Sequence, residues 1–284
     1  MKIYYNSIPG RLGNELIAYM VIRNNYENYE FYEIKINDKI LPLIYKENKN
    51  TKNIIENKIC SIHGIQQLPN LNNNYNNFQI NLTGWFQRYE YIQNIEIKNE
   101  IYNAFNFLQK IKPINEFIIH IRSGDQWIHN KPNRDAVQSG QPILPISFYK
   151  NILKNNTLPV RFVCENLNDK YIKELQKQFK YASFQSTNVL NDFITLLGAK
   201  KLALSISTFS WCGCYLNNYA EEFYFPLDGM FHHNYGKDIH NNNEREYTNF
   251  IITNDNRINY INLVNGKIKK WMGNENDFNY VINN

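Results

Sequence analysis

The segment Phe117-Ile118-Ile119-His120-Ile121-Arg122-Ser123-Gly124-Asp125 decides the fold class of this chain. Its apolar half predicts a buried strand, and its polar half places a histidine, an arginine and an aspartate at or beyond the end of that strand. In open parallel sheets, ligands bind at this edge. Arginine offers a planar fork of donors, and glycine lets backbone come close to a ligand. The segment is therefore typical of a site that holds an anion beside a carboxylate.

Strands and helices alternate on the C-terminal side of this segment. The patterns predict strands at 116–122, 160–164, 182–184, 201–206 and 222–226, and helices at 146–154, 169–179, 190–199 and 209–218. Such alternation predicts an α/β fold with a parallel sheet that helices cover on both faces. The long polar loop after the first strand, at 123–143, is of a kind that often carries function.

The N-terminal part of the chain has a weaker pattern. Strands are predicted at 2–8, 31–36 and 78–84, helices at 15–25 and 97–110, and no element in the asparagine-rich stretch 45–76. Because Pro113 ends the last of these helices, we place a domain boundary there, with one domain at 1–112 and another at 113–284. The tail from residue 232 contains a predicted hairpin around Asn265-Gly266, with no assigned role.

Composition narrows the class of protein. Hydrophobic residues make up 43% of the 284 residues, which supports a folded core, and the net charge is +5. The lysines and arginines are scattered, so we do not expect a nucleic-acid partner. None of the four cysteines has a zinc-site spacing, and we expect buried free thiols. With no signal-peptide pattern and no apolar run of about 20 residues, we expect a cytoplasmic protein, and peripheral membrane contact stays open.

Two segments that start predicted helices carry groups suited to anions. Gly10-Arg11-Leu12-Gly13-Asn14-Glu15 lies between a strand and a helix, where exposed N–H groups favour an anion, although an ordinary tight turn has the same composition. Ser205-Ile206-Ser207-Thr208-Phe209-Ser210-Trp211 crowds hydroxyls at another helix start, where they either cap the helix or bind a pyrophosphate.

Other candidate residues also have purely structural interpretations. Asp192 opens a predicted helix, and a carboxylate there stabilises the helix without any ligand. Arg122 and Asp125 have the spacing of a salt-bridged pair, and His120 suits a core histidine. The sequence lacks an Asp-x-Asp pair, a His-Glu-x-x-His motif and a Gly-x-Ser-x-Gly elbow, so metal-dependent and serine hydrolysis are poorly supported.

Six short motifs follow one another along the chain: Gly-Arg-Leu-Gly-Asn (10–14), Gly-Trp-Phe-Gln (84–87), His-Ile-Arg-Ser-Gly-Asp (120–125), Asn-Asp-Phe (191–193), Ser-Thr-Phe-Ser-Trp (207–211) and Phe-Pro (225–226). Their content and order resemble glycosyltransferase family 11, the α-1,2-fucosyltransferases of the wider GDP-fucose-dependent superfamily. The resemblance runs from Pro9 to about Leu227 and does not cover the tail.

The resemblance implies a GT-B architecture, in which two Rossmann-like domains face a cleft. It also implies an inverting, metal-independent transfer of fucose from GDP-fucose to a hydroxyl of a glycan acceptor. Arg122 would neutralise the diphosphate. The other residues implied on the donor side are His120, Asp192, Ser207, Thr208, Phe209 and Ser210. The facing loop of the N-terminal domain would contain Gly10, Arg11, Gly13 and Asn14.

Three positions depart from the family pattern. Ser123 stands where the family usually has a second arginine, Glu15 where it has glutamine, and Trp211-Cys212 where it has a tryptophan pair. A same-fold glycosyltransferase with another nucleotide sugar, and a non-catalytic glycan- or nucleotide-binding protein, therefore stay open as alternatives. For the catalytic base that takes the acceptor proton, Asp125 and Glu15 are the candidates.

Overall fold

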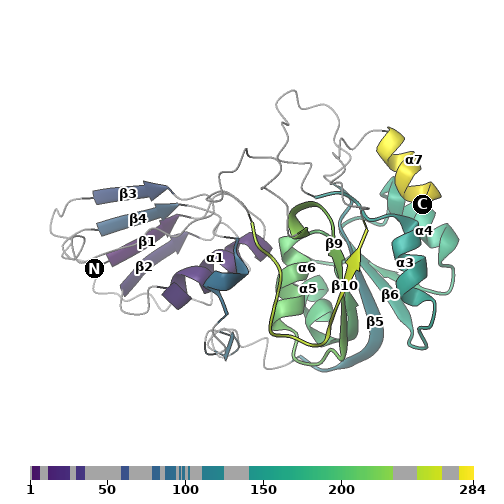
Figure 1. Cartoon of the computed structure of the whole chain (residues 1–284), viewed down its shortest axis with the longest axis horizontal. Helices are drawn as coiled ribbons and strands as arrows, with labels where there is room; N and C mark the ends of the chain where they lie inside the picture. The colour runs from purple at the N-terminus through teal and green to yellow at the C-terminus, as the bar shows by residue number, and fades with distance from the viewer. Residues whose placement is uncertain are drawn as a thin grey trace. The chain divides into compact units, whose positions relative to one another are not determined.

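The computed structural model divides into two compact units (Figure 1): Met1–Lys110 with Gly236–Asn249, and Ile111–Tyr235 with Phe250–Asn284. The structure describes residues 2–6, 12–25, 30–35, 59–63, 79–83, 87–93, 96, 98–99, 102, 111–124, 141–232, 248–263 and 275–284.

The first unit contains a four-stranded parallel sheet. Its strands are β1 (Lys2–Asn6), β2 (Glu30–Lys35), β3 (Ile59–His63) and β4 (Gln79–Thr83), in the order β2-β1-β4-β3. Helix α1 (Leu12–Asn25) connects β1 to β2, and the short helix η2 is Tyr89–Tyr91. Two sequence expectations were wrong here. Strand β3 lies within the stretch 45–76, and α1 begins at Leu12, three residues before the predicted start.

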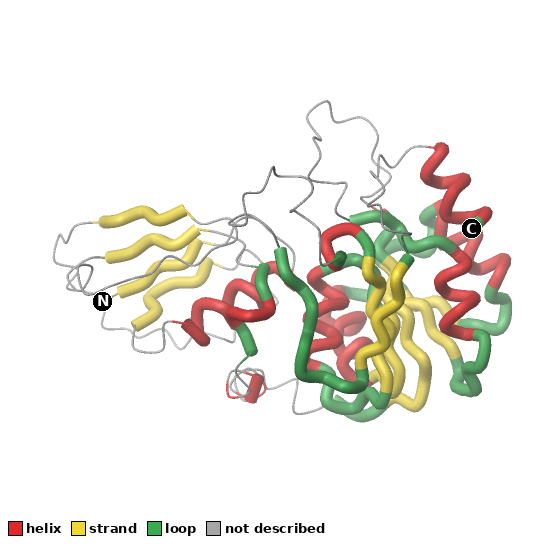
Figure 2. The backbone as a smooth tube through the Cα atoms, viewed as in Figure 1, coloured by secondary structure: helices red, strands yellow, loops and turns green. Residues whose placement is uncertain are grey.

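The second unit contains a six-stranded sheet in which all strands are parallel (Figure 2). The strands are β5 (Ile114–Ile121), β6 (Val160–Cys164), β7 (Ser183–Gln185), β8 (Ala199–Ala203), β9 (Glu222–Leu227) and β10 (Ile258–Asn262). Their order is β10-β9-β8-β5-β6-β7. Counted from β5, this is the 3-2-1-4-5-6 order of a Rossmann sheet. The prediction of an α/β fold with a parallel sheet is confirmed.

Helices cover both faces of this sheet (Figure 1). Helices α5 (Val189–Gly198) and α6 (Thr208–Leu216) pack on each other on one face. Helices α3 (Ile146–Leu153) and α4 (Lys170–Gln178) lie on the other face, where both contact α7 (Glu275–Asn283). Neither α7 nor the short helix η6 (Gly229–Phe231) was predicted from the sequence.

Burial on both faces explains why the apolar run of β5 occupies the centre of the sheet. Phe117, Ile118 and Ile119 have no exposed surface, and Ile121 is 1% exposed. β5 pairs with β6 through Ile119 and Phe162, and with β8 through Ile119 and Ala203. A strand without a polar face is stable only between two covered neighbours, so this sequence requires helices on both sides.

Side-chain caps determine where α4 and α6 begin, and one glycine determines how closely α6 approaches α5. Asp169 accepts hydrogen bonds from the first-turn amides of α4, and Ser207 accepts one from the first turn of α6. At Gly213, a Cβ atom would lie 2.9 Å from a side-chain carbon of Leu196. Glycine at this position therefore lets α6 approach α5 more closely than any other residue would.

The tail adds the sixth strand. β10 pairs in parallel with β9, with Ile258 opposite Phe223. The predicted strand at 258–263 is thus present. The predicted turn at Asn265-Gly266 and the second arm of the hairpin lie outside the described residues.

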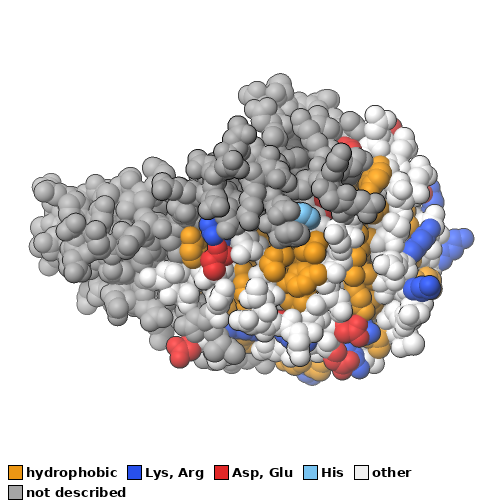
Figure 3. All heavy atoms as spheres, viewed as in Figure 1, with side chains coloured by type: hydrophobic (Ala, Val, Ile, Leu, Met, Phe, Trp, Pro, Cys, Tyr) orange, Lys and Arg blue, Asp and Glu red, His pale blue; other side chains and the backbone are white. Residues whose placement is uncertain are grey.

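Charged side chains of both signs lie on the described part of the surface drawn in Figure 3. The ion pairs among the described residues include Lys200 with Glu221 and Lys201 with Glu222, which are partly exposed. Pairs of this kind typically contribute at most about 1 kcal/mol. Among the described helices, none has the length and hydropathy that crossing a bilayer requires.

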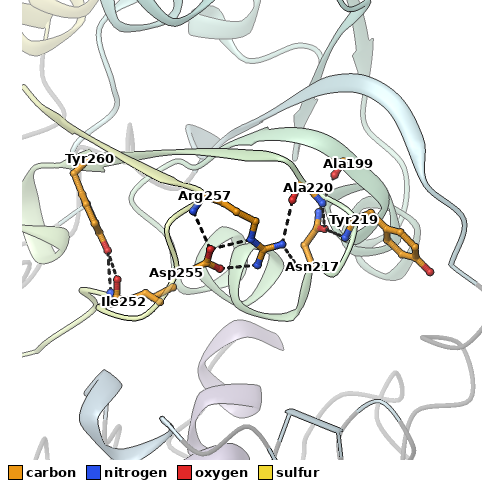
Figure 4. A network of polar contacts seen from close by, with 8 residues as sticks. All are labelled: Ala199, Asn217, Tyr219, Ala220, Ile252, Asp255, Arg257 and Tyr260. Atoms are coloured by element: carbon orange, nitrogen blue, oxygen red, sulfur yellow. Dashed lines mark hydrogen bonds and ion pairs between the residues drawn. The ribbon is translucent and has the colours of Figure 1, made fainter.

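A partly buried polar network, drawn in Figure 4, joins the turns that precede β9 and β10 to the start of β8. The amide nitrogen of Asn217, a residue with no exposed surface, donates to the carbonyls of Leu196 and Ala199. Its amide oxygen accepts from the backbone N–H groups of Tyr219 and Ala220, each at 2.7 Å. One side chain thus connects the end of α5, the start of β8 and the turn before β9.

Arg257 extends this network to β10. Its guanidinium pairs with Asp255 and donates to the carbonyl oxygens of Asn217 and Ala220. It also lies over the ring of Phe223, 4.8 Å from the centroid. The turns that precede β9 and β10 are therefore held together by side chains that satisfy backbone carbonyls.

We expect Asn217→Asp to lower the free energy of unfolding by about 3–5 kcal/mol at pH 7, because a carboxylate would face two buried carbonyls that now accept hydrogen bonds. Urea denaturation measures the change. Asn155→Asp, at an exposed asparagine, is the matched control and should stay within about 0.5 kcal/mol of wild type. Equal stability of the two variants would contradict this account of the network.

Candidate functional site

The candidate site lies where β5 and β8 end side by side. The chain leaves β5 toward α3 on one face of the sheet and leaves β8 toward α6 on the other face. Because the two connections diverge, the carboxyl ends of these strands form the topological switch point at which open α/β sheets bind ligands. His120 lies near the end of β5, the segment 122–124 follows that strand, and the segment 205–210 follows β8.

A hydrogen bond joins the two strand ends. The Nδ1 atom of His120 lies 2.7 Å from the hydroxyl oxygen of Ser205. Both side chains are buried, with 9% of His120 and 3% of Ser205 exposed. The ring of His120 also packs on Phe209 in α6, with 5.2 Å between ring centroids, and Phe209 packs on Phe193 in α5 at the same distance. The structure thus brings together His120 and Phe209, two of the predicted donor-side residues.

Burial keeps the imidazole of His120 neutral. Loss of solvation, together with the nearby positive charge of Arg122, lowers the pKa of His120 to about 3. A neutral imidazole has one donor and one acceptor nitrogen, and the contact with Ser205 occupies Nδ1. Nε2 is then the ring nitrogen that a ligand can use.

The hydroxyls at the start of α6 mainly stabilise the turn itself. Ser207 caps the helix by accepting from the N–H of Phe209. The Ser210 hydroxyl faces the carbonyl oxygens of Ser205 and Ser207, at 2.8 and 3.0 Å. Ser207, Thr208 and Ser210 are at most 5% exposed. The main feature that this turn can offer an anion is the positive end of a helix.

Arg122 occupies the position directly after β5. It is two residues beyond His120, its side chain is partly exposed, and its charge acts on His120. Ser123 is 1% exposed, and no described residue is within hydrogen-bonding reach of its hydroxyl. A Cβ atom on Gly124 would lie 3.2 Å from a carboxylate oxygen of Glu165, which directly follows β6. The arginine and a carboxylate therefore lie at the same edge of the sheet.

Asp192 has a clear structural role. It lies in the first turn of α5 and is 9% exposed. Its carboxylate accepts hydrogen bonds from the amide of Gln185 and from the hydroxyl and backbone N–H of Thr187. These contacts close the turn between β7 and α5. A role for Asp192 in donor binding stays a prediction.

The glycine motif belongs to the first unit. Gly13 and Asn14 lie in the first turn of α1 rather than in a loop, which corrects the sequence interpretation, and Glu15 lies in the helix as predicted. The amide of Gln87 donates to Asn14 Oδ1 at 3.0 Å, so two motifs 73 residues apart meet. Glu15 is 3% exposed. The remaining predicted site residues, Gly10, Arg11 and Asp125, lie outside the described residues.

The described cysteines behave as predicted. Cys164, Cys212 and Cys214 are buried and free of disulfides. Burial raises the pKa of Cys164 to about 12, and the charge of Asp192 contributes. Within the described ranges, no three histidine, cysteine or acidic side chains are grouped so that they could hold a metal ion. Metal independence itself stays a prediction.

The sequence analysis placed Ser205 and Gln87 in motifs without giving them a role in the site, and it did not single out Glu165. Ser205 is the partner of His120, Glu165 lies against Gly124, and Gln87 binds Asn14. Ser205 and Glu165 each follow a strand closely, and Gln87 ends a recognised motif. Their positions in the sequence could have indicated a role in the site. Their contacts could not be predicted, because the contacts at the strand ends depend on the order of the strands in the sheet.

No protein-family model matches the chain, and no curated protein matches its sequence. The relation to glycosyltransferase family 11 thus rests on the six motifs and remains a proposal.

We expect His120 to make the stability of the protein depend on pH between about 3 and 6.5. In this range the unfolded chain binds a proton at His120 and the folded chain does not, so stability rises with pH by up to about 1.4 kcal/mol per unit. Above this range the contribution is constant. Urea denaturation at several pH values measures the free energy of unfolding as a function of pH. In His120→Gln the slope of this curve between about pH 3 and 6.5 should fall by the contribution of one proton.

A nitrogen-15 NMR titration of the imidazole tests the same point without a mutation. The folded protein at pH 5 should show a neutral ring at His120. A charged imidazole at that pH, or an unchanged slope in His120→Gln, would contradict the assignment.

Proposed function

We propose that this protein is an inverting glycosyltransferase that moves fucose from GDP-fucose to a hydroxyl of a glycan acceptor. One observation carries the proposal: His120 and Arg122 at the end of β5 share the switch point of a Rossmann-like sheet with the start of α6. A guanidinium and a helix N-terminus are two of the strongest groups for binding a diphosphate. The order of the six motifs supports fucose as the sugar.

The proposed architecture is GT-B-like, with the acceptor on the side of the first unit. A parallel sheet with a connecting helix in each unit supports this assignment. The family resemblance makes Gly10, Arg11, Gly13 and Asn14 the candidate acceptor-side residues of this architecture. The hydrogen bond between Asn14 and Gln87 would hold the Asn14 side chain in place.

In the proposed reaction, an acceptor hydroxyl oxygen attacks the anomeric carbon from the face opposite the diphosphate. The bond from that carbon to the phosphate oxygen breaks, GDP leaves with the electron pair, and a carboxylate takes the acceptor proton. Negative charge grows on the leaving phosphate in the transition state. Arg122 and the N-terminus of α6 are suited to stabilise that charge, because neither has to reorganise during the reaction.

The main alternative is a glycosyltransferase of the same fold with a different nucleotide sugar. Ser123 favours it, since the family usually has a second arginine there and this site has one cation fewer. Thermal-shift measurements with GDP, UDP, CMP and dTDP separate the two, because only the preferred nucleotide should raise the melting temperature strongly. Binding of a nucleotide without turnover on a broad acceptor panel would favour a non-catalytic binding protein.

We expect Arg122→Ala to lower kcat for GDP release from GDP-fucose by about two to three orders of magnitude, because one preorganised donor to the leaving phosphate is lost. Arg122→Lys should recover part of the rate, since lysine keeps the charge but not the fork of donors. A GDP-release assay with a glycan acceptor measures both variants.

Lys177→Ala is the control for loss of a positive charge. Lys177 lies in the last turn of α4, is exposed and binds Glu174, so its loss should leave donor turnover near the wild-type value. Circular dichroism confirms that the variants fold. A folded Arg122→Ala protein with wild-type turnover would end the assignment of Arg122 to the donor phosphate.

The base is tested with Asp125→Asn and Glu15→Gln. We expect one of the two to lower kcat by about 10²–10⁴-fold, because each amide keeps the shape of the carboxylate but cannot accept the proton. The affinity for GDP should change little in both variants. If both retain wild-type kcat, neither residue is the base.

A further inference from the structure

We propose that Glu165 binds the ribose hydroxyls of the nucleotide at the β5–β8 site and makes the site selective for ribonucleotides over 2′-deoxyribonucleotides. The inference rests on the proposed function, because it assigns a subsite next to the diphosphate. Glu165 was not among the residues that the sequence indicated.

Sheet topology places Glu165 at the position where a ribose is read. β6 lies next to β5 on the side opposite β8, and Glu165 is the first residue after β6. In dinucleotide-binding sheets of this strand order, an acidic residue downstream of the turn after the first strand accepts a hydrogen bond from the ribose 2′-hydroxyl. With phosphates at Arg122 and α6, a nucleoside that extends over β6 brings its ribose to Glu165.

The carboxylate of Glu165 lies close to Gly124, three residues beyond the end of β5. An added Cβ at Gly124 would lie 3.2 Å from Glu165 Oε2, so the backbone beyond Arg122 and the carboxylate are neighbours. Because glycine has no side chain, the backbone at Gly124 can come this close to the carboxylate. The Glu165 side chain is exposed, so a ligand can reach it.

The backbone of Glu165 is held by the next loop. The Ser186 hydroxyl, just beyond β7, donates to the carbonyl of Glu165 at 2.9 Å. Residues following β5, β6 and β7 therefore lie in one row, and Glu165 is in the middle. Two other described acidic groups lie near this row: Asp192 accepts hydrogen bonds from Gln185 and Thr187, and Asp169 caps α4.

The chemistry of a carboxylate suits a vicinal diol. An ionised carboxylate only accepts hydrogen bonds, and its two oxygens can each accept from one hydroxyl of the ribose. Hydrogen bonds to a charged group typically contribute about 1.5–3 kcal/mol, which corresponds to tenfold or more in affinity. A glutamine keeps the shape but replaces one acceptor with a donor.

Isothermal titration calorimetry with GDP, 2′-deoxy-GDP, UDP and 2′-deoxy-UDP tests the proposal. We expect wild type to bind its preferred ribonucleotide about tenfold more tightly than the deoxy form. In Glu165→Gln this ratio should fall to about twofold or less. Glu221→Gln, at an exposed glutamate beside Lys200 at the other edge of the sheet, should keep the wild-type ratio.

Two results would overturn the proposal while the proposed function stands: equal affinity of wild type for the ribo and deoxy forms, or an unchanged ratio in Glu165→Gln. An equal loss of affinity for both forms in Glu165→Gln would also overturn it, since the carboxylate would then act elsewhere than on the ribose. If none of the four nucleotides binds wild type, the proposed function fails, and this inference fails with it.

Discussion

The hydrogen bond between His120 and Ser205 is the contact on which the candidate site depends. It joins the carboxyl ends of β5 and β8, two strands that are 85 residues apart in sequence at this contact. Because both groups are buried, each needs a polar partner, and the other strand supplies it. The position of Arg122, two residues beyond His120, and that of the α6 cap at Ser207, two residues beyond Ser205, follow from this contact. The cation and the helix N-terminus thus come to one place by way of a neutral imidazole.

The sequence predicted the second unit well because its central strands, β5, β6 and β8, are mostly buried. The run from Phe117 to Ile121 has no polar position facing solvent until the strand ends, so its identity does not depend on neighbours. Strand β3 and helix α7 were missed because neither segment contains a long continuous apolar run. β3 lies in an asparagine-rich stretch, and α7 has only two buried positions, Asp277 and Val281. Helix α7 packs on α3 and α4, and the periodicity of its own sequence does not predict such packing.

The candidate site was predictable only in part. His120 and Arg122 were found because a strand that ends in charged residues is visible in one segment of sequence. The contacts of Ser205 and Glu165 depend on the order of the strands, which no local pattern determines. Asp192, Ser207 and Ser210 show the converse. Their types suit a ligand, but the structure gives them partners within their own turns. Composition indicates which groups are present, and the strand order determines which of them meet.

The two edges of the large sheet have separate roles. At the amino edge, the side chains of Asn217 and Arg257 satisfy backbone carbonyls and hold the turns together. At the carboxyl edge, the loops after β5 and β6 carry Arg122 and Glu165. No described residue of either loop contributes to the Asn217 network, so substitutions at these described residues leave that support intact. Sequence changes can therefore accumulate beside Arg122 and Glu165 while the turns at the amino edge keep their support.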